Sequence, residues 1–383
     1  MRDKQKIRIC YYGHKRIPSR EGGVEIVVEE LAVRMAARGL AVTCINRNGH
    51  HVSGAEYDSE KIREYQGVKI ETVPTIDRKG LAAASAAFFA SIKVAFGRYD
   101  IVHIHAEGPA AFCWLPKLCG KKVIVTCHGL DWKRPRWKGT FAGKFIKYGE
   151  KMAVRYADEI IVLSKGVQDY FRQTYGRETV LIPNGVNRPD KEKAKLIRDK
   201  WNLEENSYIL ACSRLTEEKR IHLLIKAFRK IHTDKKLVIA GGSSDSDAYI
   251  EMLHDLAKDD SRIVFTGFVQ GQVLAELYSN AYLYCLPSEL EGMPLSLLEA
   301  MSYGNCCLTA DIPECTDVVE NHGISFKTND TDDLERKLEM LIKNPEQVGK
   351  YKCEAADFIC SKYNWNDIAE ETLKLYQKAG RKK

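Results

Sequence analysis

The stretch Pro287-Ser-Glu-Leu-Glu-Gly-Met-Pro-Leu-Ser-Leu-Leu-Glu-Ala-Met301 says most about the fold and the chemistry of this chain. Apolar residues at helical spacing follow Pro294, and Pro fits the first position of a helix because its missing N–H costs nothing there. We therefore expect Glu291 in the loop before a helix and Glu299 in the second turn of that helix. The free N–H groups and the positive dipole end of the helix face the same space.

A nucleotide sugar would suit this arrangement, because it carries sugar hydroxyls at one end, a ribose at the other and phosphates between them. The segment also resembles the Glu–seven residues–Glu signature of family 4 glycosyltransferases, which are retaining enzymes with the two-domain GT-B fold. The resemblance implies that Glu299 binds the donor ribose and that Glu291 holds the transferring sugar. It assigns four further residues to donor binding: Gly292, Met293, Pro294 and Leu295. The alternative interpretation is an ordinary amphipathic helix with a solvated glutamate.

Length and composition limit the class of protein. At 383 residues the chain is long enough for two domains, each with its own core. The 12 cysteines form no Cys-x-x-Cys pair and no cluster with zinc spacing, so we expect reduced, mostly buried thiols in a cytoplasmic protein. The N-terminus lacks the apolar core of a signal peptide. The longest apolar run, 81–96, is too short and too interrupted to span a bilayer.

Strand-like apolar runs alternate with helical patterns along most of the chain, which is typical of doubly wound parallel sheets. The expected strands fall into two series: 7–12, 41–46, 101–105, 122–127 and 159–163, then 208–212, 236–240, 263–266, 281–286 and 305–309. We therefore expect an α/β protein with two Rossmann-like domains, which the resemblance to the GT-B fold places face to face across a cleft.

A dense cluster of turn residues at 182–190 marks the expected domain boundary. We assign 1–185 to an acceptor-side domain and 186–363 to a domain that binds the nucleotide sugar. The tail, 364–383, has a helical pattern, and in the GT-B fold such a helix crosses back to the first domain.

Two glycine-containing loops are candidates for donor contact, one at the phosphates and one at the nucleobase. Gly22 and Gly23 follow the first strand at the start of a helix, where backbone N–H groups can approach an anion. They resemble the Gly-Gly of the first loop in bacterial polysaccharide glycosyltransferases, which lies at the donor diphosphate. Arg20 either assists this loop or faces solvent. By the same resemblance, Gly267-Phe268-Val269, after a strand of the second domain, lies along the nucleobase.

A pair of cations follows the first strand of the second domain. Arg214 and Lys219 can neutralise a diphosphate and stabilise its charge as the sugar departs. The segment is similar to the Arg-Leu-x-x-x-Lys phosphate clamp of the family, with Arg220 where the family usually has Gly. This departure puts in question how closely the backbone turns. Outside the family context, the pair would be surface charges at a helix start.

His128 is expected at a strand end, in Val123-Ile-Val-Thr-Cys-His-Gly-Leu-Asp-Trp132. The matching histidine of the family touches the donor sugar and supports positive charge on it, so we count His128, with Glu291, Arg214 and Lys219, as catalytic. Asp131 and Trp132 are weaker candidates for contact with the acceptor. A lone histidine at a strand end is otherwise a hydrogen-bonded structural residue.

Basic residues are unevenly distributed along the chain. Residues 1–185 hold 31 Lys and Arg against 19 Asp and Glu, and the remainder holds 28 against 33. Segment 131–155 contains eight basic and two acidic residues interleaved with aromatics. Such a segment can dock on anionic lipid, with about 1 kcal/mol from each cation, or form a solvated basic helix whose aromatics face the core. No recognition motif for nucleic acid accompanies the charge.

The resemblance extends over nearly the whole chain and implies a retaining glycosyltransferase without cofactor or essential metal. We expect a UDP-, dTDP- or GDP-linked donor and a lipid-linked saccharide acceptor of cell-surface polysaccharide synthesis, such as capsule, at the inner face of the membrane. Asp245-Ser-Asp247 fits an Asp-x-Asp metal motif, but its polar surroundings indicate a loop. Two alternatives are a sugar-nucleotide epimerase with the same fold and a non-catalytic partner subunit.

Overall fold

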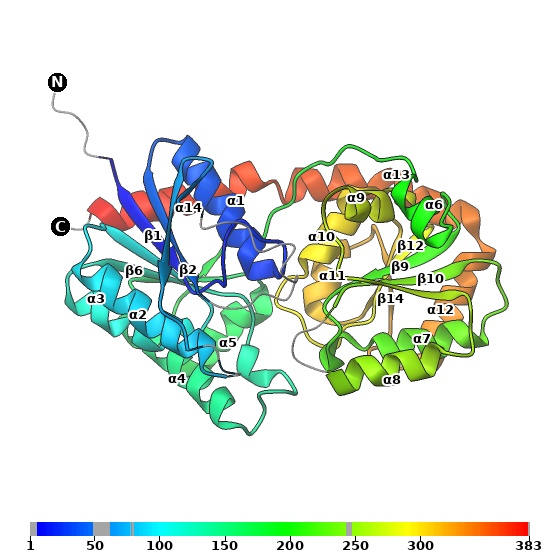
Figure 1. Cartoon of the computed structure of the whole chain (residues 1–383), viewed down its shortest axis with the longest axis horizontal. Helices are drawn as coiled ribbons and strands as arrows, with labels where there is room; N and C mark the ends of the chain where they lie inside the picture. Colours follow the sequence, from blue (N-terminus) through cyan, green and yellow to red (C-terminus); the bar gives the residue numbers. More distant parts are fainter. Residues whose placement is uncertain (1–5, 49–61, 77, 79, 243–246, 382–383) are drawn as a thin grey trace. The chain divides into compact units, whose positions relative to one another are not determined.

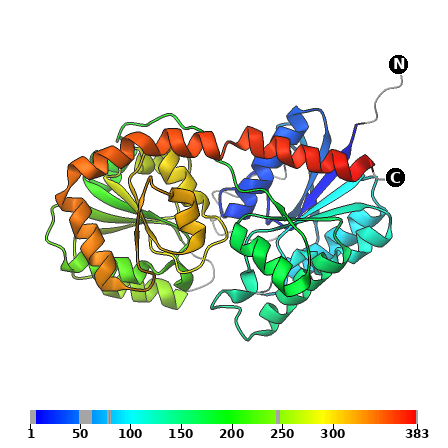
Figure 2. The same ribbon diagram turned by 180° about the vertical axis from the view of Figure 1, so that it is seen from behind.

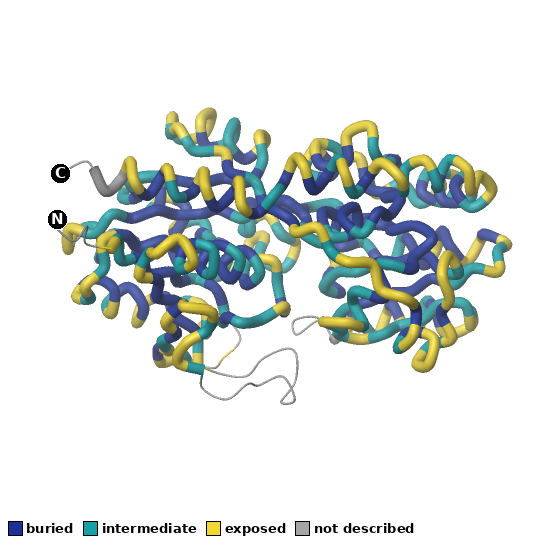
Figure 3. The backbone as a smooth tube through the Cα atoms, turned by 90° about the horizontal axis from the view of Figure 1, so that it is seen from above, coloured by how far each residue is buried: buried dark blue, intermediate teal, exposed yellow. Residues whose placement is uncertain are grey.

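The computed structural model describes residues 6–48, 62–76, 78, 80–242 and 247–381. The chain divides into two compact units (Figure 1). Unit 1 comprises Met1–Asn184 and Trp365–Lys383, and unit 2 comprises Gly185–Asn364. In both units the central strands are buried, while exposed residues lie mostly on the outward turns of helices, in loops and on edge strands (Figure 3).

The strands of unit 1 are β1 (Arg8–Tyr12), β2 (Ala41–Arg47), β3 (Glu64–Tyr65), β4 (Val68–Val73), β5 (Ile101–His105), β6 (Lys122–Cys127), β7 (Glu159–Val162) and β8 (Val180–Leu181). They form one sheet in the order β3-β4-β2-β1-β5-β6-β7-β8. Neighbours pair in parallel, except that β3 and β4 are antiparallel at the edge.

The helices of unit 1 are α1 (Gly23–Ala37), α2 (Ala82–Phe96), α3 (Trp114–Leu118), α4 (Phe141–Tyr156), α5 (Lys165–Tyr175) and α14 (Trp365–Arg381), with short 3-10 turns η2 (Pro109–Phe112) and η3 (Asp131–Lys133). Alternate strand residues point to opposite faces of the sheet. Cys10 and Val102 belong to the core beneath α2, α4 and α5. Tyr11 and His103 face α14, whose Tyr376 hydroxyl lies 2.8 Å from the Tyr11 hydroxyl and 2.6 Å from His103 Nδ1. Figure 2 shows α14 running along α1.

Unit 2 contains the strands β9 (Tyr208–Cys212), β10 (Lys236–Ala240), β11 (Ile263–Gly267), β12 (Leu283–Leu286), β13 (Cys307–Ala310) and β14 (Ile324–Phe326). They form a parallel sheet in the order β11-β10-β9-β12-β13-β14. Its helices are α6 (Leu196–Trp201), α7 (Ile221–Lys230), α8 (Asp247–Ala257), α9 (Gly271–Asn280), α10 (Leu295–Ser302), α11 (Pro313–Val319), α12 (Thr331–Lys343) and α13 (Pro345–Lys362), with the 3-10 turn η4 (Glu217–Lys219). The core lies between the sheet and α7, α8 and α12.

The predicted α/β class with two parallel sheets is confirmed, and the differences are local. Four strands were not predicted: β3, β4, β8 and β14. Of these, β3, β8 and β14 are only two or three residues long and lie at sheet edges. Pro294 caps α10 from one residue before the helix, with extended ψ, whereas the sequence predicted it inside the first turn. Glu299 lies in the second turn of α10, as predicted.

In each sheet the strand order reverses direction at one point. In unit 2 the chain starts at β9, builds β10 and β11 on one side, then crosses to β12 and continues outward. In unit 1 the corresponding neighbours are β1 and β5. Open α/β sheets bind ligands beyond the carboxyl ends of the strands at such a point. We therefore expect ligand contacts in the loops after β9 and β12 and in those after β1 and β5.

Candidate active site

In unit 2, the predicted donor-binding residues lie along one edge of the sheet. Gly267 ends β11 and Phe268-Val269 follows it, Arg214 and Lys219 follow β9, and Glu291 follows β12. Because β11, β10, β9 and β12 are consecutive in the sheet, their ends extend over about 14 Å at the usual strand spacing. The fold thus brings residues separated by up to 77 positions in sequence to one carboxyl edge.

Lys219 and Glu291 form a buried ion pair. Lys219 Nζ donates to Glu291 Oε1 at 2.6 Å, and the two side chains are 10% and 7% exposed. The loops that carry them are joined by a backbone bond from Glu289 N to the carbonyl of Glu218 at 2.9 Å. A buried carboxylate that fixes a lysine at the sheet edge orients the ammonium group for an anionic ligand.

Arg220 shows how the departure from the family pattern is accommodated. Its φ is +52°, the left-handed region in which Gly is the usual residue. The guanidinium pairs with Glu289 across the two loops. The turn that the family makes with Gly is therefore made here with Arg, and Lys219 keeps its place in η4.

Glu299 is oriented by a tyrosine from the neighbouring helix α9. The Tyr278 hydroxyl lies 3.4 Å from Glu299 Oε2 and 3.4 Å from the carbonyl of Ser296. The ring of Tyr278 is buried and stacks on Tyr303 at 5.4 Å. No local pattern marks Tyr278, because it comes from α9 and meets α10 only in the folded unit. Arg214 lies half-buried in the loop after β9.

Gly241, at the end of β10, is required for the loops of this edge to meet. Its φ is +138°, and a Cβ there would lie 1.9 Å from the carbonyl oxygen of Ser213. We expect Gly241→Ala to lower the free energy of unfolding by about 3 kcal/mol or more, measured by urea unfolding. Gly267→Ala is the matched control, because its φ is +68° and nothing lies within 4 Å of a new Cβ; it should cost only about 1 kcal/mol. Equal losses in the two variants would contradict this interpretation.

In unit 1, His128 follows β6 and lies beside His105, the last residue of β5. The atoms His105 Nδ1 and His128 Nε2 are 2.9 Å apart, and the rings stack at 5.2 Å. Burial lowers the pKa of His128 to about 4, partly offset by Asp131 and Glu25. The imidazole of His128 is therefore neutral at pH 7, and its orientation is set by His105.

The buried histidines of unit 1 should make the free energy of unfolding depend on pH. Burial lowers the pKa of His14 and His128 to about 4 and that of His103 to about 3, from 6.5. Between pH 6.5 and these pKa values the unfolded chain binds more protons than the folded protein. The contribution of these histidines to the free energy of unfolding is therefore fully present above pH 6.5 and is lost as the pH falls towards the folded-state pKa values. We expect His103→Gln to flatten this slope in urea unfolding measured at several pH values. His232→Gln, at an exposed histidine, should leave it unchanged, and an unaltered slope in His103→Gln would refute the assignment.

Gly22 and Gly23 begin α1, as the predicted anion site requires, but a carboxylate already lies there. Gly22 is the N-cap, and a Cβ on it would come within 2.6 Å of Glu25 Oε2. Glu25 Oε1 accepts the backbone N–H of Lys15 at 2.8 Å. The sequence analysis missed Glu25, although a glutamate three residues after an N-cap is a recognised capping signal.

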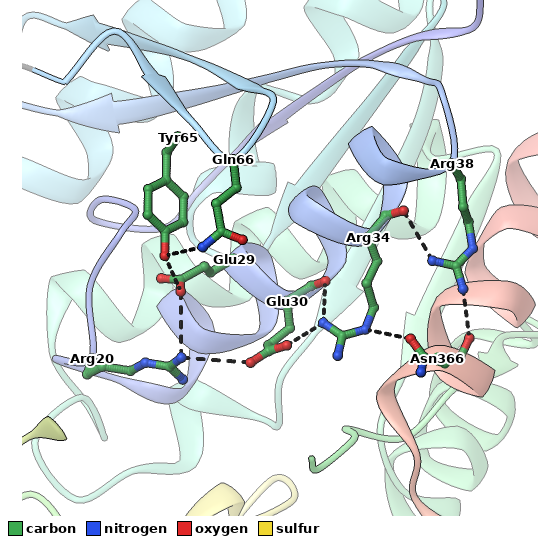
Figure 4. A network of polar contacts seen from close by, with 8 residues as sticks. All are labelled: Arg20, Glu29, Glu30, Arg34, Arg38, Tyr65, Gln66 and Asn366. Atoms are coloured by element: carbon green, nitrogen blue, oxygen red, sulfur yellow. Dashed lines mark hydrogen bonds and ion pairs between the residues drawn. The ribbon is translucent and has the colours of Figure 1, made fainter. Parts of the chain in front are cut away.

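Arg20 turns onto α1 and leaves the glycine loop (Figure 4). Its guanidinium pairs with Glu29 and Glu30 at 3.6 and 3.8 Å. Glu30 pairs in turn with Arg34, which donates to Asn366 Oδ1 at 3.2 Å. Of the two predictions for Arg20, this geometry favours a half-exposed surface position that ties the first loop to α1.

The acceptor candidates Asp131 and Trp132 are both engaged within unit 1. Asp131 pairs with Arg134 at 2.7 Å, and Trp132 Nε1 donates to Glu150 Oε2 at 2.8 Å. Glu150 is fully buried and also accepts from Lys147 Nζ at 2.8 Å. Trp132 therefore faces inward, toward α4, and does not point freely into solvent.

Among the residues that the structure describes, no group of three or more His, Cys, Asp or Glu side chains could hold a metal ion. Asp245 and Ser246, in the predicted loop, lie outside the described residues. Within the described ranges, no helix is both long and apolar enough to cross a membrane.

Comparison with known proteins relates both halves of the chain to glycosyltransferases. The family described as Glycosyltransferase Family 4 matches residues 21–188, and that described as Glycosyl transferases group 1 matches residues 193–358. An uncharacterised glycosyltransferase of Methanocaldococcus jannaschii is 25% identical over 368 residues, which cover 88% of this chain and 94% of that protein.

Two further similarities concern a characterised relative and a solved structure. The N,N'-diacetylbacillosaminyl-diphospho-undecaprenol alpha-1,3-N-acetylgalactosaminyltransferase of Campylobacter jejuni is 24% identical over 243 residues, 60% of this chain and 62% of that protein. The Anabaena HepE structure in complex with UDP-glucose aligns with a TM-score of 0.79 at 16% identity, over 97% of this chain and 100% of that one. The fold is therefore GT-B, as predicted, and the chain belongs to the family 4 glycosyltransferases, enzymes that transfer a sugar from a nucleotide-sugar donor.

Proposed function

We propose that the carboxyl edge of the unit 2 sheet binds the diphosphate of the donor through Lys219 and Arg214. The observation that supports this most is the buried pair of Lys219 with Glu291 beside the point where strand order reverses. Glu299, oriented by Tyr278, binds the ribose, and Glu291 with the backbone of Gly292 holds the transferring sugar. Gly267-Phe268-Val269 lies along the base.

The enzyme retains the configuration of the sugar and needs no protein nucleophile, metal or cofactor. The departing phosphate takes the proton of the acceptor hydroxyl on the face from which it leaves. Lys219 and Arg214 stabilise the charge that develops on that phosphate. The part of His128 in this proposal is to support positive charge on the sugar as a neutral imidazole.

The acceptor is a lipid-linked saccharide, and unit 1 is the acceptor-side domain of a cytoplasmic, peripheral membrane enzyme. Two features favour this: the basic excess of residues 1–185 and the undecaprenol-linked substrate in the name of the Campylobacter jejuni relative. The UDP-glucose bound by HepE makes a UDP-sugar the first donor to test, with dTDP- and GDP-sugars beside it.

The test is a product assay with each donor class and an undecaprenyl-diphosphate-linked sugar, with and without a chelator. We expect transfer from one donor class, an anomeric configuration like that of the donor by NMR, and no loss in chelator. Inversion, or a loss in chelator that manganese restores, would contradict the mechanism. Isomerisation of the donor alone would identify an epimerase, and a lack of all turnover would indicate a partner subunit.

A further inference from the structure

Large apolar side chains are exposed on one layer of unit 1. Phe141, at the start of α4, is 86% exposed. Among the described residues of unit 2, Met252 is the only exposed large apolar side chain, with an exposed fraction of 36%. The exposed residues on α2, α3 and α4, with the one just before α2, are Leu81, Phe88, Phe89, Phe96, Leu118, Phe141 and Tyr148.

Aromatic contacts join this layer into one surface. Phe88 of α2 lies edge-on to Phe112 of η2 at 5.4 Å, and Phe112 lies 6.0 Å from Phe145 of α4. Phe89 continues the row at 5.6 Å from Phe88. The helices α2, α3 and α4 share one side of the unit 1 sheet (Figure 1). We call the outer surface of α2, η2 and α4 the α2–α4 face.

Cations border the apolar residues on α4. Phe141, Lys144, Tyr148, Lys151 and Arg155 are exposed and recur every three or four positions, so they form one stripe along the helix. The two carboxylates of segment 131–155 do not neutralise this stripe, because one is buried and the other pairs with Arg134. They are Glu150 and Asp131.

We propose that the α2–α4 face docks on the interface of an anionic lipid bilayer. Aromatic side chains suit the boundary between headgroups and acyl chains, and lysines that flank them reach lipid phosphates. A protein partner fits less well, since lysine is depleted at protein–protein interfaces. The surface is also broader than segment 131–155, because α2 supplies Phe88 and Phe89, while the Trp132 indole N–H donates to the buried Glu150.

The position of this face links it to the acceptor. Helices α2 and α4 follow β4 and β6, so both begin at the carboxyl edge of the sheet, where His128 lies. A lipid-linked saccharide would therefore reach that edge from the docked bilayer. This link rests on the proposed function, whereas binding to the bilayer does not.

The test is co-sedimentation of the full chain with vesicles of phosphatidylcholine, with and without phosphatidylglycerol, at low and high salt. We expect binding that requires phosphatidylglycerol and weakens in high salt. Phe141→Ser with Tyr148→Ser, and separately Lys144→Glu with Lys151→Glu, should each reduce the bound fraction about tenfold or more. Met252→Ser and Lys343→Glu, at exposed positions of unit 2, are the matched controls.

Three results would overturn the proposal. The first is that the protein binds neither kind of vesicle. The second is that the two double variants bind as well as the controls. The third is that the protein forms a concentration-dependent dimer, which the variant with Phe141→Ser no longer forms. Each variant must keep the wild-type melting temperature and donor-induced stabilisation. If the wild-type protein binds vesicles but is not stabilised by any donor, the result would instead count against the proposed function.

Discussion

Replacing Lys219 by Met should reduce turnover by about a thousandfold, because the variant loses a cation that is buried at the reversal point of the unit 2 sheet. Groups aimed at charge that develops in the transition state each contribute about 100- to 1,000-fold. Lys219 is held in place by Glu291 at 2.6 Å, so its ammonium group is oriented before any donor arrives. The measurement is the turnover number at saturating donor and acceptor.

A stability effect must be separated from this loss. Lys219→Met leaves Glu291 buried without its partner, which costs about 3–5 kcal/mol in typical buried pairs. The double variant Lys219→Met with Glu291→Gln removes the stranded charge, so we expect stability near wild type and turnover still absent. Lys230→Met, at a half-exposed lysine paired on the surface with Asp332 and Glu335, is the control. Turnover within a factor of ten of wild type in the Lys219→Met variant would exclude the clamp.

Glu299→Gln should lower kcat/KM for the donor by about 10- to 100-fold. A ribose hydroxyl that donates to a carboxylate forms a charged hydrogen bond, and such bonds contribute about 1.5–3 kcal/mol. The amide of Gln keeps the shape of the side chain but accepts a weaker bond. Initial rates at varied donor concentration give the effect, which should appear in KM as well as in turnover.

Tyr278→Phe tests whether Glu299 acts through its orientation. The variant removes the hydroxyl that lies 3.4 Å from Glu299 Oε2 and leaves the buried ring in place. We expect a smaller loss than for Glu299→Gln, and no further loss when the two changes are combined. Full activity in Glu299→Gln, with a half-exposed surface control such as Glu339→Gln also fully active, would show that Glu299 does not contact the donor.

Much of the fold could be predicted from sequence because buried parallel strands are continuous apolar runs. The runs at 101–105, 122–127, 208–212 and 236–240 have the bounds that the structure gives. Strands such as β14 escaped prediction because three residues at a sheet edge bury too little surface to leave a pattern.

The site was predictable in its residue types and less so in its contacts. The segment around Glu291 and Glu299 identified the family, but the pairing of Glu291 with Lys219 joins residues 72 positions apart. Only the neighbouring positions of β9 and β12 bring them together. Trp132 illustrates the opposite case: composition left open whether the aromatics of segment 131–155 face lipid or the core, and only the structure shows that the Trp132 indole donates to the buried Glu150.

The most direct test of the donor site is a thermal-shift titration with UDP-, dTDP- and GDP-sugars. It compares the wild type with the double variant that carries Lys219→Met and Glu291→Gln. At 100 to 1,000 times its dissociation constant, one donor class should stabilise the wild type by about 3–4 kcal/mol and leave the double variant unshifted. Equal stabilisation of both proteins, or of neither by any donor, would contradict a donor site at the carboxyl edge of the unit 2 sheet.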